Sequence, residues 1–309
     1  MNPYKRIFFS FCLCFFSTLV PAKEGDGGCK ALVFDQLNYL PRQVESYPFR
    51  VWYATEGKNV LSNVEYGEDK NTVPTVIEDL LLQLHSADRY FSQELGLTPP
   101  LLKQRYRQAE FIDVYLVAME KGNGLAFDEV RALKRSKEAE SHSCAIKIHI
   151  NSALQPSRNI TPAHELFHLY QYANTMFKTR WYLEGMARWT EQAFRGISVN
   201  EVKKPIPGSC TEVLNESYGA ERYWRDLAAK LGGDDIVLEP EYRSLHYADG
   251  SAVFNTSVFK NGAAVKAIFD LLADKSHQVS LEQGLHKYQW PETLQRSPQF
   301  DFQICELLD

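Results

Sequence analysis

Three segments of the chain have the β-branched or alternating pattern that is typical of β-strands. They are residues 49–54, 111–118 and 145–151. In the third segment, isoleucine takes every second position from Ile146 to Ile150, and Lys147 and His149 take the positions between. Successive side chains of a strand point to opposite faces, so we expect one face of this strand to pack on a core and the other to meet solvent or a ligand.

Helical spacing dominates the later part of the chain. One long amphipathic helix comes earlier and is predicted from Pro74 to Gly96, where Gly96 and two following prolines end it. Further helices are predicted at residues 162–173, 183–194, 217–231, 250–259 and 263–275. Residues 120–143 are rich in charge and are expected to form an exposed connection. The pattern predicts an α+β fold with a strand-rich part at residues 23–160 and a mainly helical part at residues 161–309.

The first 22 residues differ from the rest of the chain. Lys5 and Arg6 precede an almost wholly apolar run from Ile7 to Val20, and small residues follow that run. This is the pattern of a secretory signal peptide. The alternative is an uncleaved anchor, but a run of about fourteen residues is shorter than the roughly twenty that span a bilayer. We therefore expect an exported protein, periplasmic or secreted, with no membrane span after residues 1–22 are removed.

Composition and charge exclude several classes of protein. With 44% hydrophobic and 24% charged residues, the chain of 309 residues lacks the bias of disordered, collagen-like and coiled-coil sequences. Its 34 basic and 39 acidic residues are interspersed and give a net charge of -5, which becomes -7 without Lys5 and Arg6. No basic stripe is present that would attract nucleic acid, so nucleic acid is not expected as a partner.

Four cysteines remain after the predicted signal peptide. An even number of cysteines in an exported protein favours disulfide bonds, here two, and buried free thiols are the alternative. Four cysteines allow three pairings, and the sequence does not choose among them. No pair has the Cys-x-x-Cys spacing of a thiolate zinc site or redox site. The four residues are Cys29, Cys144, Cys210 and Cys305.

The segment from Thr161 to His168, Thr-Pro-Ala-His-Glu-Leu-Phe-His, carries the clearest chemical signal. A helix is predicted to begin here, because Thr161 can cap it and proline suits its first turn. His164 and His168 are four residues apart, so they share one face of that helix and both imidazoles can reach one ion. Glu165 follows the first histidine and can accept a proton from a water bound to that ion. The pattern is His-Glu-x-x-His, that of the zinc proteases.

A catalytic zinc ion needs a third protein ligand, without which the two histidines would be ordinary helix residues. Glu184 provides it within the segment Trp-Tyr-Leu-Glu-Gly-Met-Ala, at the start of the next predicted helix. Gly185 and Ala187 are small and would let two helices pack closely beside a metal. The predicted ligands of one zinc ion are therefore His164, His168 and Glu184.

These two segments together resemble the gluzincins, the peptidase MA-like zinc metallopeptidases in which two histidines and a glutamate bind zinc. The pattern Trp181-x-x-Glu184-Gly185-x-Ala187 is also similar to a motif of membrane-alanyl aminopeptidases, and residues 48–195 resemble a group of exported bacterial metalloproteases. The resemblance implies a zincin-like α+β fold: a twisted mixed sheet in the N-terminal part, the active-site helix at the junction and a mainly helical C-terminal part.

Two departures from the aminopeptidases favour an endopeptidase. Fifteen residues separate His168 from Glu184, fewer than in those enzymes. Their Gly-Ala-Met-Glu-Asn segment, which binds the amino terminus of a substrate, is absent from this sequence.

Tyr247 is predicted to donate a hydrogen bond to the carbonyl oxygen as it gains negative charge. In the aminopeptidases this role belongs to a tyrosine in a Tyr-x-x-Gly segment that opens a later helix, and residues 247–250 are similar. His246 is the alternative donor, and a tyrosine that only packs at a helix start is the alternative interpretation. Glu191 lies two turns after Glu184 on the same face of their predicted helix. It is either an outer partner of a ligand histidine or a solvated surface residue.

The predicted function is that of an exported zinc metallopeptidase that acts on peptides or proteins. Glu165 would take a proton from a zinc-activated water and return it to the leaving amine. An extended substrate is expected to pair with the edge of the strand that ends near Ile150, with Lys147 or His149 near the cleft unless they face solvent. The alternatives are an inactive zinc-containing binding module that uses the same cleft, and a metal-free binding protein in which the motif is coincidental.

Overall fold

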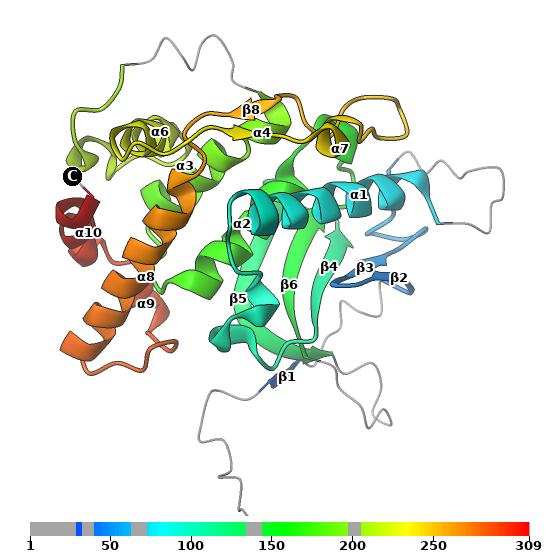
Figure 1. The fold of residues 1–309 in the computed structure, drawn as a ribbon. Helices are drawn as coiled ribbons and strands as arrows, with labels where there is room; N and C mark the ends of the chain where they lie inside the picture. The colour runs from blue at the N-terminus through cyan, green and yellow to red at the C-terminus, as the bar shows by residue number, and fades with distance from the viewer. Residues whose placement is uncertain (1–28, 33–39, 63–72, 134–143, 197–204, 309) are drawn as a thin grey trace, which may run out of the picture.

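The computed structural model describes residues 29–32, 40–62, 73–133, 144–196 and 205–308 of the chain. They form an α+β fold in which a mixed β-sheet lies beside a helical half (Figure 1). The predicted α+β class is confirmed. The predicted signal peptide, residues 1–22, lies outside the described residues.

The main sheet has six strands in the order β1-β5-β6-β4-β3-β2. β3, β4 and β6 run parallel, and β1 is parallel to β5. β2 is antiparallel to β3, and β5 is antiparallel to β6. The three strands predicted from the sequence are present as β3, β4 and β6. The strands are β1 Lys30–Leu32, β2 Arg42–Ser46, β3 Phe49–Tyr53, β4 Phe111–Val117, β5 Gly124–Leu133 and β6 Cys144–Asn151.

β5 overturns the prediction that residues 120–143 are a connection throughout. It carries charged residues because one side of the strand is an edge over most of its length: β6 pairs with its inner side, whereas β1 pairs only with Arg131–Leu133. Charged residues are common on edge strands, because they prevent pairing with other chains. Residues 134–143 lie outside the described part of the chain.

Two long helices cover one face of the sheet. α1 (Thr75–Arg89) continues through a π-helical turn, Tyr90–Glu94, and ends near Gly96 at φ 65°. α2 (Thr161–Asn174) packs against α1 and also contacts β5 and β6. The isoleucines of β6 are 0% exposed in the core between the sheet and these helices, as their alternation predicts.

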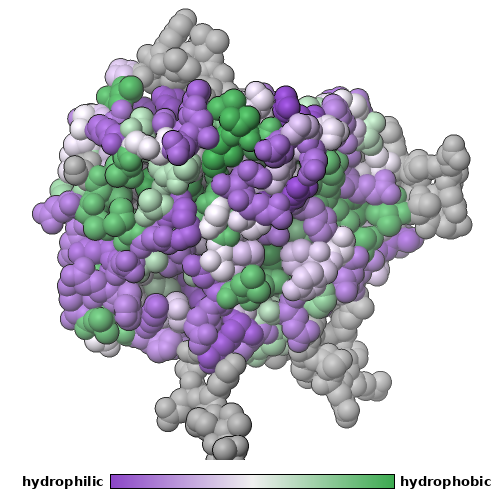
Figure 2. Space-filling model, in the orientation of Figure 1, coloured by the Kyte–Doolittle hydropathy of each residue, from purple (hydrophilic) through white to green (hydrophobic). Residues whose placement is uncertain are grey.

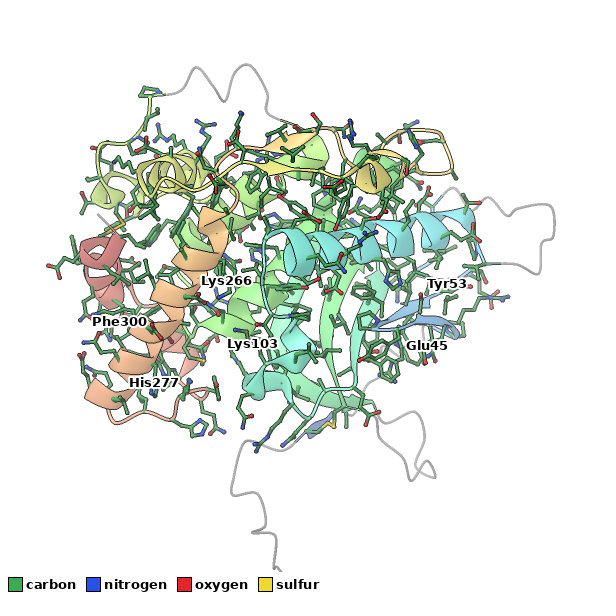
Figure 3. All side chains as sticks on the ribbon, in the orientation of Figure 1. Glu45, Tyr53, Lys103, Lys266, His277 and Phe300 are labelled. Carbon is green, nitrogen blue, oxygen red and sulfur yellow. A yellow bond between two sulfur atoms is a disulfide. The ribbon has the colours of Figure 1, made fainter. Side chains whose placement is uncertain are left out.

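Short and long helices form the other half of the molecule. Figure 1 shows α8 and α10 on the opposite side of the molecule from β2 and β3, and Figure 3 labels His277 and Phe300 in that helical half. β7 (Ile236–Val237) and β8 (Val258–Phe259) make a separate antiparallel pair. The helices are α3 Arg180–Thr190, α4 Gln192–Arg195, α6 Glu221–Lys230, α7 Pro240–Arg243, α8 Ala264–Glu282, α9 Glu292–Gln295 and α10 Asp301–Leu308.

One predicted helix of this half, residues 250–259, is wrong. Gly250 has a φ of 81°, in the left-handed region, and closes a tight turn in which its N–H bonds to the Tyr247 carbonyl. The chain then returns beside itself through a His246–Ala252 bridge and continues into β8. The four other helices predicted after residue 160 are present as α2, α3 with α4, α6 and α8.

Two disulfide bonds join the four remaining cysteines, Cys29 to Cys144 and Cys210 to Cys305. They resolve the pairing that the sequence left open, and they are compatible with an exported protein. Within the described residues, no helix has both the length and the hydropathy that a membrane span requires. On the face that Figure 2 shows, apolar residues form separate groups among polar ones.

Candidate metal centre

α2 and α3 bring the three predicted zinc ligands together. His164 and His168 share one face of α2, and the chain then turns so that the start of α3 places Glu184 opposite them. Glu184 Oε2 lies 3.2 Å from His164 Nε2 and 3.7 Å from His168 Nε2. The ligand atoms of the three residues lie within 4.8 Å of one another, so the group could hold a metal ion.

The donor set and its spacing suit zinc. Four tetrahedral ligands at roughly 2.0–2.1 Å from an ion are about 3.4 Å from one another, close to the two distances above. Two imidazole nitrogens and one carboxylate oxygen also form the protein part of known catalytic zinc sites, in which a fourth position is left for water. The residues present therefore fit the ion that the sequence predicts.

The second ring nitrogen of each histidine also has a side-chain partner. His164 Nδ1 lies 3.0 Å from Glu191 Oε2, and His168 Nδ1 lies 2.8 Å from Gln171 Oε1. Such contacts fix the ring orientation and the tautomer of a metal ligand. Glu191 is 4% exposed, which excludes the solvated-surface interpretation. Gln171 was not predicted, although its position three residues after His168, on the same helical face, was a usable signal.

The side chains around these two partners are themselves restrained. The Gln171 amide donates to the backbone carbonyls of Tyr182 and Leu183, which links α2 to α3. Glu191 accepts from Arg188 Nη1 at 2.6 Å, and Arg195 Nε lies 3.2 Å from it. Because a buried carboxylate is costly unless it is paired, these arginines offset the cost of burying Glu191 behind His164.

The carboxylates around His164 favour its protonated form. Burial opposes protonation of His164, but its hydrogen bonds to Glu184 and Glu191 outweigh burial and raise its pKa to about 10. Burial would raise the pKa of Glu184, yet hydrogen bonds from both histidines lower it well below its usual range. A positive charge is thus favoured between these carboxylates. A metal ion would supply that charge and would displace the proton from His164.

Glu165 lies between α2 and the free edge of β5. It is 7% exposed, and burial is the main reason that its pKa is raised, with the charge of Glu184 acting in the same direction. The backbone N–H of Ala126, on β5, donates to its carboxylate. A Cβ atom at Gly124 would lie only 2.5 Å from Glu165 Cγ, so β5 passes close to this side chain. Local patterns in the sequence did not reveal this contact, because it joins segments far apart in the chain.

The strand whose edge lies beside the candidate site is β5. The prediction that a substrate pairs with the edge of β6 is wrong. β6 is hydrogen-bonded to β4 on one side and to β5 on the other, so it has no edge for a substrate. Lys147 and His149 point to the sheet face opposite the isoleucines and therefore away from α2. There, Lys147 Nζ lies 4.0 Å from the Phe127 ring centre, and burial lowers the pKa of His149 to about 4.

Tyr247 and His246 form their hydrogen bonds with residues other than the three candidate ligands. The Tyr247 hydroxyl accepts a hydrogen bond from Gln83 Nε2 at 2.6 Å, and its pKa is raised to about 12 by burial, with smaller effects of the nearby acids Asp79 and Asp249. His246 is exposed and bonds to the Ser244 carbonyl. Among the described residues, no contact joins either side chain to the three ligands. The expected helix start is also missing, because the chain makes a turn there.

Tyr218 is the tyrosine that reaches the metal ligands. It belongs to the 3-10 turn Tyr218–Ala220, and its ring centre lies 5.7 Å from that of His164. Burial, and then the charge of Glu184 and a hydrogen bond to that carboxylate, raise its pKa to about 12. The side chain is 52% exposed, so it is accessible to a ligand. It was not predicted from the sequence, which places it far from both motifs.

Gly185 explains why this turn lies so close to α3. A Cβ atom at Gly185 would lie 2.7 Å from the Cβ of Ala220 and 3.0 Å from Trp224 Nε1. Only glycine lets Ala220 pack against α3 in this way. The small residue predicted to allow close packing beside the metal therefore does so, but its partner is the turn that carries Tyr218 and not α2.

Neither a protein-family model, nor a curated protein, nor a solved structure matches the chain. The resemblance of the two motifs to the gluzincins stays a prediction. What can be said of the site comes from the residues and their geometry.

Proposed function

We infer that this protein is an exported zinc metallopeptidase of the gluzincin type, with a zincin-like fold and endopeptidase activity. The observation that carries this proposal is the position of Glu165, buried beside the three ligands and against an edge strand. A structural zinc site closes its coordination with four protein ligands and needs no adjacent base. A catalytic site keeps a position for water and a base next to it.

Zinc, when bound by His164, His168 and Glu184, supplies a Lewis acid that lowers the pKa of a water and polarises a carbonyl. Glu165 would accept a proton from a water at that site. Its raised pKa helps it to hold the proton until it passes to the leaving amine. Glu191 and Gln171 keep the two imidazoles oriented during the reaction.

Tyr218 takes the role that the sequence gave to Tyr247. A hydroxyl beside Glu184 is placed to donate to a carbonyl oxygen that gains negative charge. Its exposure leaves room for a substrate, whereas Tyr247 is 5% exposed.

The substrate class that fits best is a peptide in an extended conformation. The outer side of β5, from Gly124 to Glu129, has no strand partner among the described residues. An extended peptide can add to such an edge through main-chain hydrogen bonds. Ala126 N–H donates to Glu165 and points away from β6, so the main chain of β5 at this position faces its outer side. A peptide placed there would have a carbonyl group next to the zinc ligands.

The decisive experiment compares the purified wild type with Glu165→Gln. Zinc content is measured by elemental analysis, and cleavage is measured with a library of quenched fluorescent peptides. We expect one zinc per chain in both proteins, and cleavage by the wild type alone. Zinc in both proteins without cleavage by either would indicate an inactive zinc-binding module. A wild type that takes up no zinc would end the metallopeptidase proposal.

A further inference from the structure

A cavity of about 400 Å³ opens at the amino-terminal end of α2. Among the residues that line it, the only charged ones are arginines, Arg158, Arg188 and Arg195. The other lining side chains are neutral, and Asn159, Tyr247 and Asn255 add polar groups. A concave surface with three guanidinium groups and no acidic side chain in its wall favours a negatively charged ligand.

The acidic residues near this cavity lie behind its wall. Glu191 and Glu221 bind Arg188 and Arg195 from the interior, with 2.6 Å between Arg195 Nη2 and Glu221 Oε2, and both acids are almost fully buried. They hold the two arginines in place and offset two of the three positive charges, so the net positive charge of the cavity comes from Arg158. Two arginines that are already ordered lose little conformational entropy when a ligand binds.

Arg158 completes the cavity from the loop that precedes α2. Its side chain is exposed, and in the described part of the chain no carboxylate lies within ion-pair distance of it. Its charge contributes to the low pKa of Asp249, about 2, although the hydroxyl of Ser251 is the main cause. Asp249 does not line the cavity. The guanidinium group of Arg158 is therefore available to a ligand.

The cavity lies one helical turn from the metal ligands on each of two helices. Ile160 lines it four residues before His164, and Arg188 lines it four residues after Glu184. One helical turn is about 5.4 Å, and an extended peptide advances about 3.3 Å per residue. A ligand group in the cavity would therefore be roughly one or two residues from a carbonyl group at the metal site.

A second cavity of the described residues has a different character. It is about 480 Å³ in volume and lies beside the bulge of β5 between Phe127 and Arg131. Two arginines and two acidic residues are among its lining residues, and Arg105 is paired with Asp128. Since these charges compensate one another, that cavity indicates no charge for its ligand.

We propose that the arginine cavity is a carboxylate-binding subsite, which selects peptides with a carboxylate within about two residues of the cleaved bond. The carboxylate belongs to an acidic side chain or to the carboxyl terminus of the substrate, since both present the same two oxygens to a guanidinium fork. This inference rests on the proposed peptidase function for its substrate. Its basis, the charge of the cavity, is independent of the metal.

The test uses pairs of peptides that differ only in one carboxylate. One pair ends in a free acid or an amide, and another carries glutamate or glutamine next to the cleaved bond. For the wild type we expect kcat/KM to be roughly 10- to 100-fold higher for the charged member of at least one pair, as a charge-assisted hydrogen bond provides. Whichever pair shows the preference identifies the source of the carboxylate.

Arg158 is the residue to change, because Arg188 and Arg195 also hold Glu191 behind His164. We expect Arg158→Gln to reduce the preference about tenfold without changing kcat/KM for the neutral peptides. Arg158→Glu should favour lysine at the same position. Arg243→Gln, an exposed arginine of α7 with the same change of charge, is the control and should keep the preference. Equal rates for both members of every pair, or a preference that Arg158→Gln leaves intact, would overturn the proposal.

Binding without cleavage separates the two proposals. Fluorescence anisotropy measures the affinity of labelled acidic and neutral peptides for Glu165→Gln, alone and combined with Arg158→Gln. Tighter binding of the acidic peptide that is lost with Arg158 supports the cavity even if the wild type cleaves nothing. Cleavage of neutral peptides that depends on Glu165, together with equal affinity for acidic and neutral peptides, would support the peptidase proposal and overturn the carboxylate subsite.

Discussion

One added methyl group at Gly124 tests whether β5 positions Glu165. In Gly124→Ala, the new Cβ would lie 2.5 Å from Glu165 Cγ and 2.5 Å from Thr161 Cγ2. Carbon atoms in contact are about 3.5–4.0 Å apart, so at least about 1 Å of displacement is required. Thr161 resists that displacement, because its N–H and hydroxyl both bond to Asn159 Oδ1, at 2.9 and 2.7 Å. Most of the movement therefore falls on Glu165.

A misplacement of about 1 Å in a catalytic group costs on the order of 100-fold in rate. We therefore expect kcat/KM of Gly124→Ala to fall about 100-fold on a quenched fluorescent peptide. Zinc content should stay at one per chain, because the atoms nearest the new methyl group belong to Glu165 and Thr161. Overpacking costs roughly 1–3 kcal/mol of unfolding free energy, and the gain from replacing a strand glycine offsets about 0.5–1 kcal/mol of it.

Leu125→Ala is the matched control. Leu125 follows Gly124, points to the other sheet face beside His149 and is 49% exposed. Its truncation should leave kcat/KM within about twofold of the wild type. If Gly124→Ala keeps both full zinc and wild-type kcat/KM, the reasoning that β5 restrains the catalytic base is refuted. If zinc is lost as well, the displacement reaches the ligands and the specific role given to Glu165 is not supported.

Four further substitutions test other contacts of the structure. Gln171→Leu removes the partner of His168 Nδ1, and zinc affinity measured by competition with a chelator should fall about 10- to 100-fold. Tyr218→Phe should lower kcat about 100- to 1,000-fold with zinc content unchanged, while Tyr247→Phe stays near the wild type. Asp128→Asn should lower the unfolding free energy in urea by about 1–3 kcal/mol at pH 7. Burial opposes the charge of Asp128, but the charges of Arg105 and Lys178 outweigh burial and lower its pKa. The loss of unfolding free energy in Asp128→Asn should therefore shrink as the pH falls below about 4.

Each of these predictions has an outcome that would contradict it. Unchanged chelator competition in Gln171→Leu would mean that the hydrogen bond to His168 does not orient the ligand. If Tyr247→Phe loses activity and Tyr218→Phe does not, the sequence-based choice of tyrosine was right. If the difference in unfolding free energy between wild type and Asp128→Asn is as large at pH 3 as at pH 7, its cause is packing and not the charge of the carboxylate.

The grouping of the candidate metal ligands could be predicted because helix geometry is local. A spacing of four residues fixes the relation of His164 to His168 wherever the helix lies in the fold. The same geometry places Gln171 beside His168, three residues later. Glu184 was predicted from its motif, and the short connection between α2 and α3 limits where it can go. For these residues the sequence separation is small, so local rules were sufficient.

The edge strand could not be predicted for the opposite reason. Nothing within residues 124–133 reveals that they pair antiparallel to β6, because the pairing depends on both strands and on the connection between them. The charges of β5 resembled those of a loop, since one side of the strand is unpaired for most of its length. Consequently the sequence placed the substrate edge on β6, which the structure encloses between two neighbours.

The two tyrosines show what a sequence motif alone does not determine about function. A Tyr-x-x-Gly pattern states which residues follow one another, but a hydrogen bond to a substrate depends on where the hydroxyl lies. Tyr247 lies against Gln83, which also accepts the Ala163 N–H at the start of α2, so its place in the fold explains its burial without catalysis. Tyr218 reaches Glu184 because Gly185 lets Ala220 approach α3. The glycine of the zinc motif thus decides which tyrosine meets the metal ligands, through a contact between segments that the sequence keeps apart.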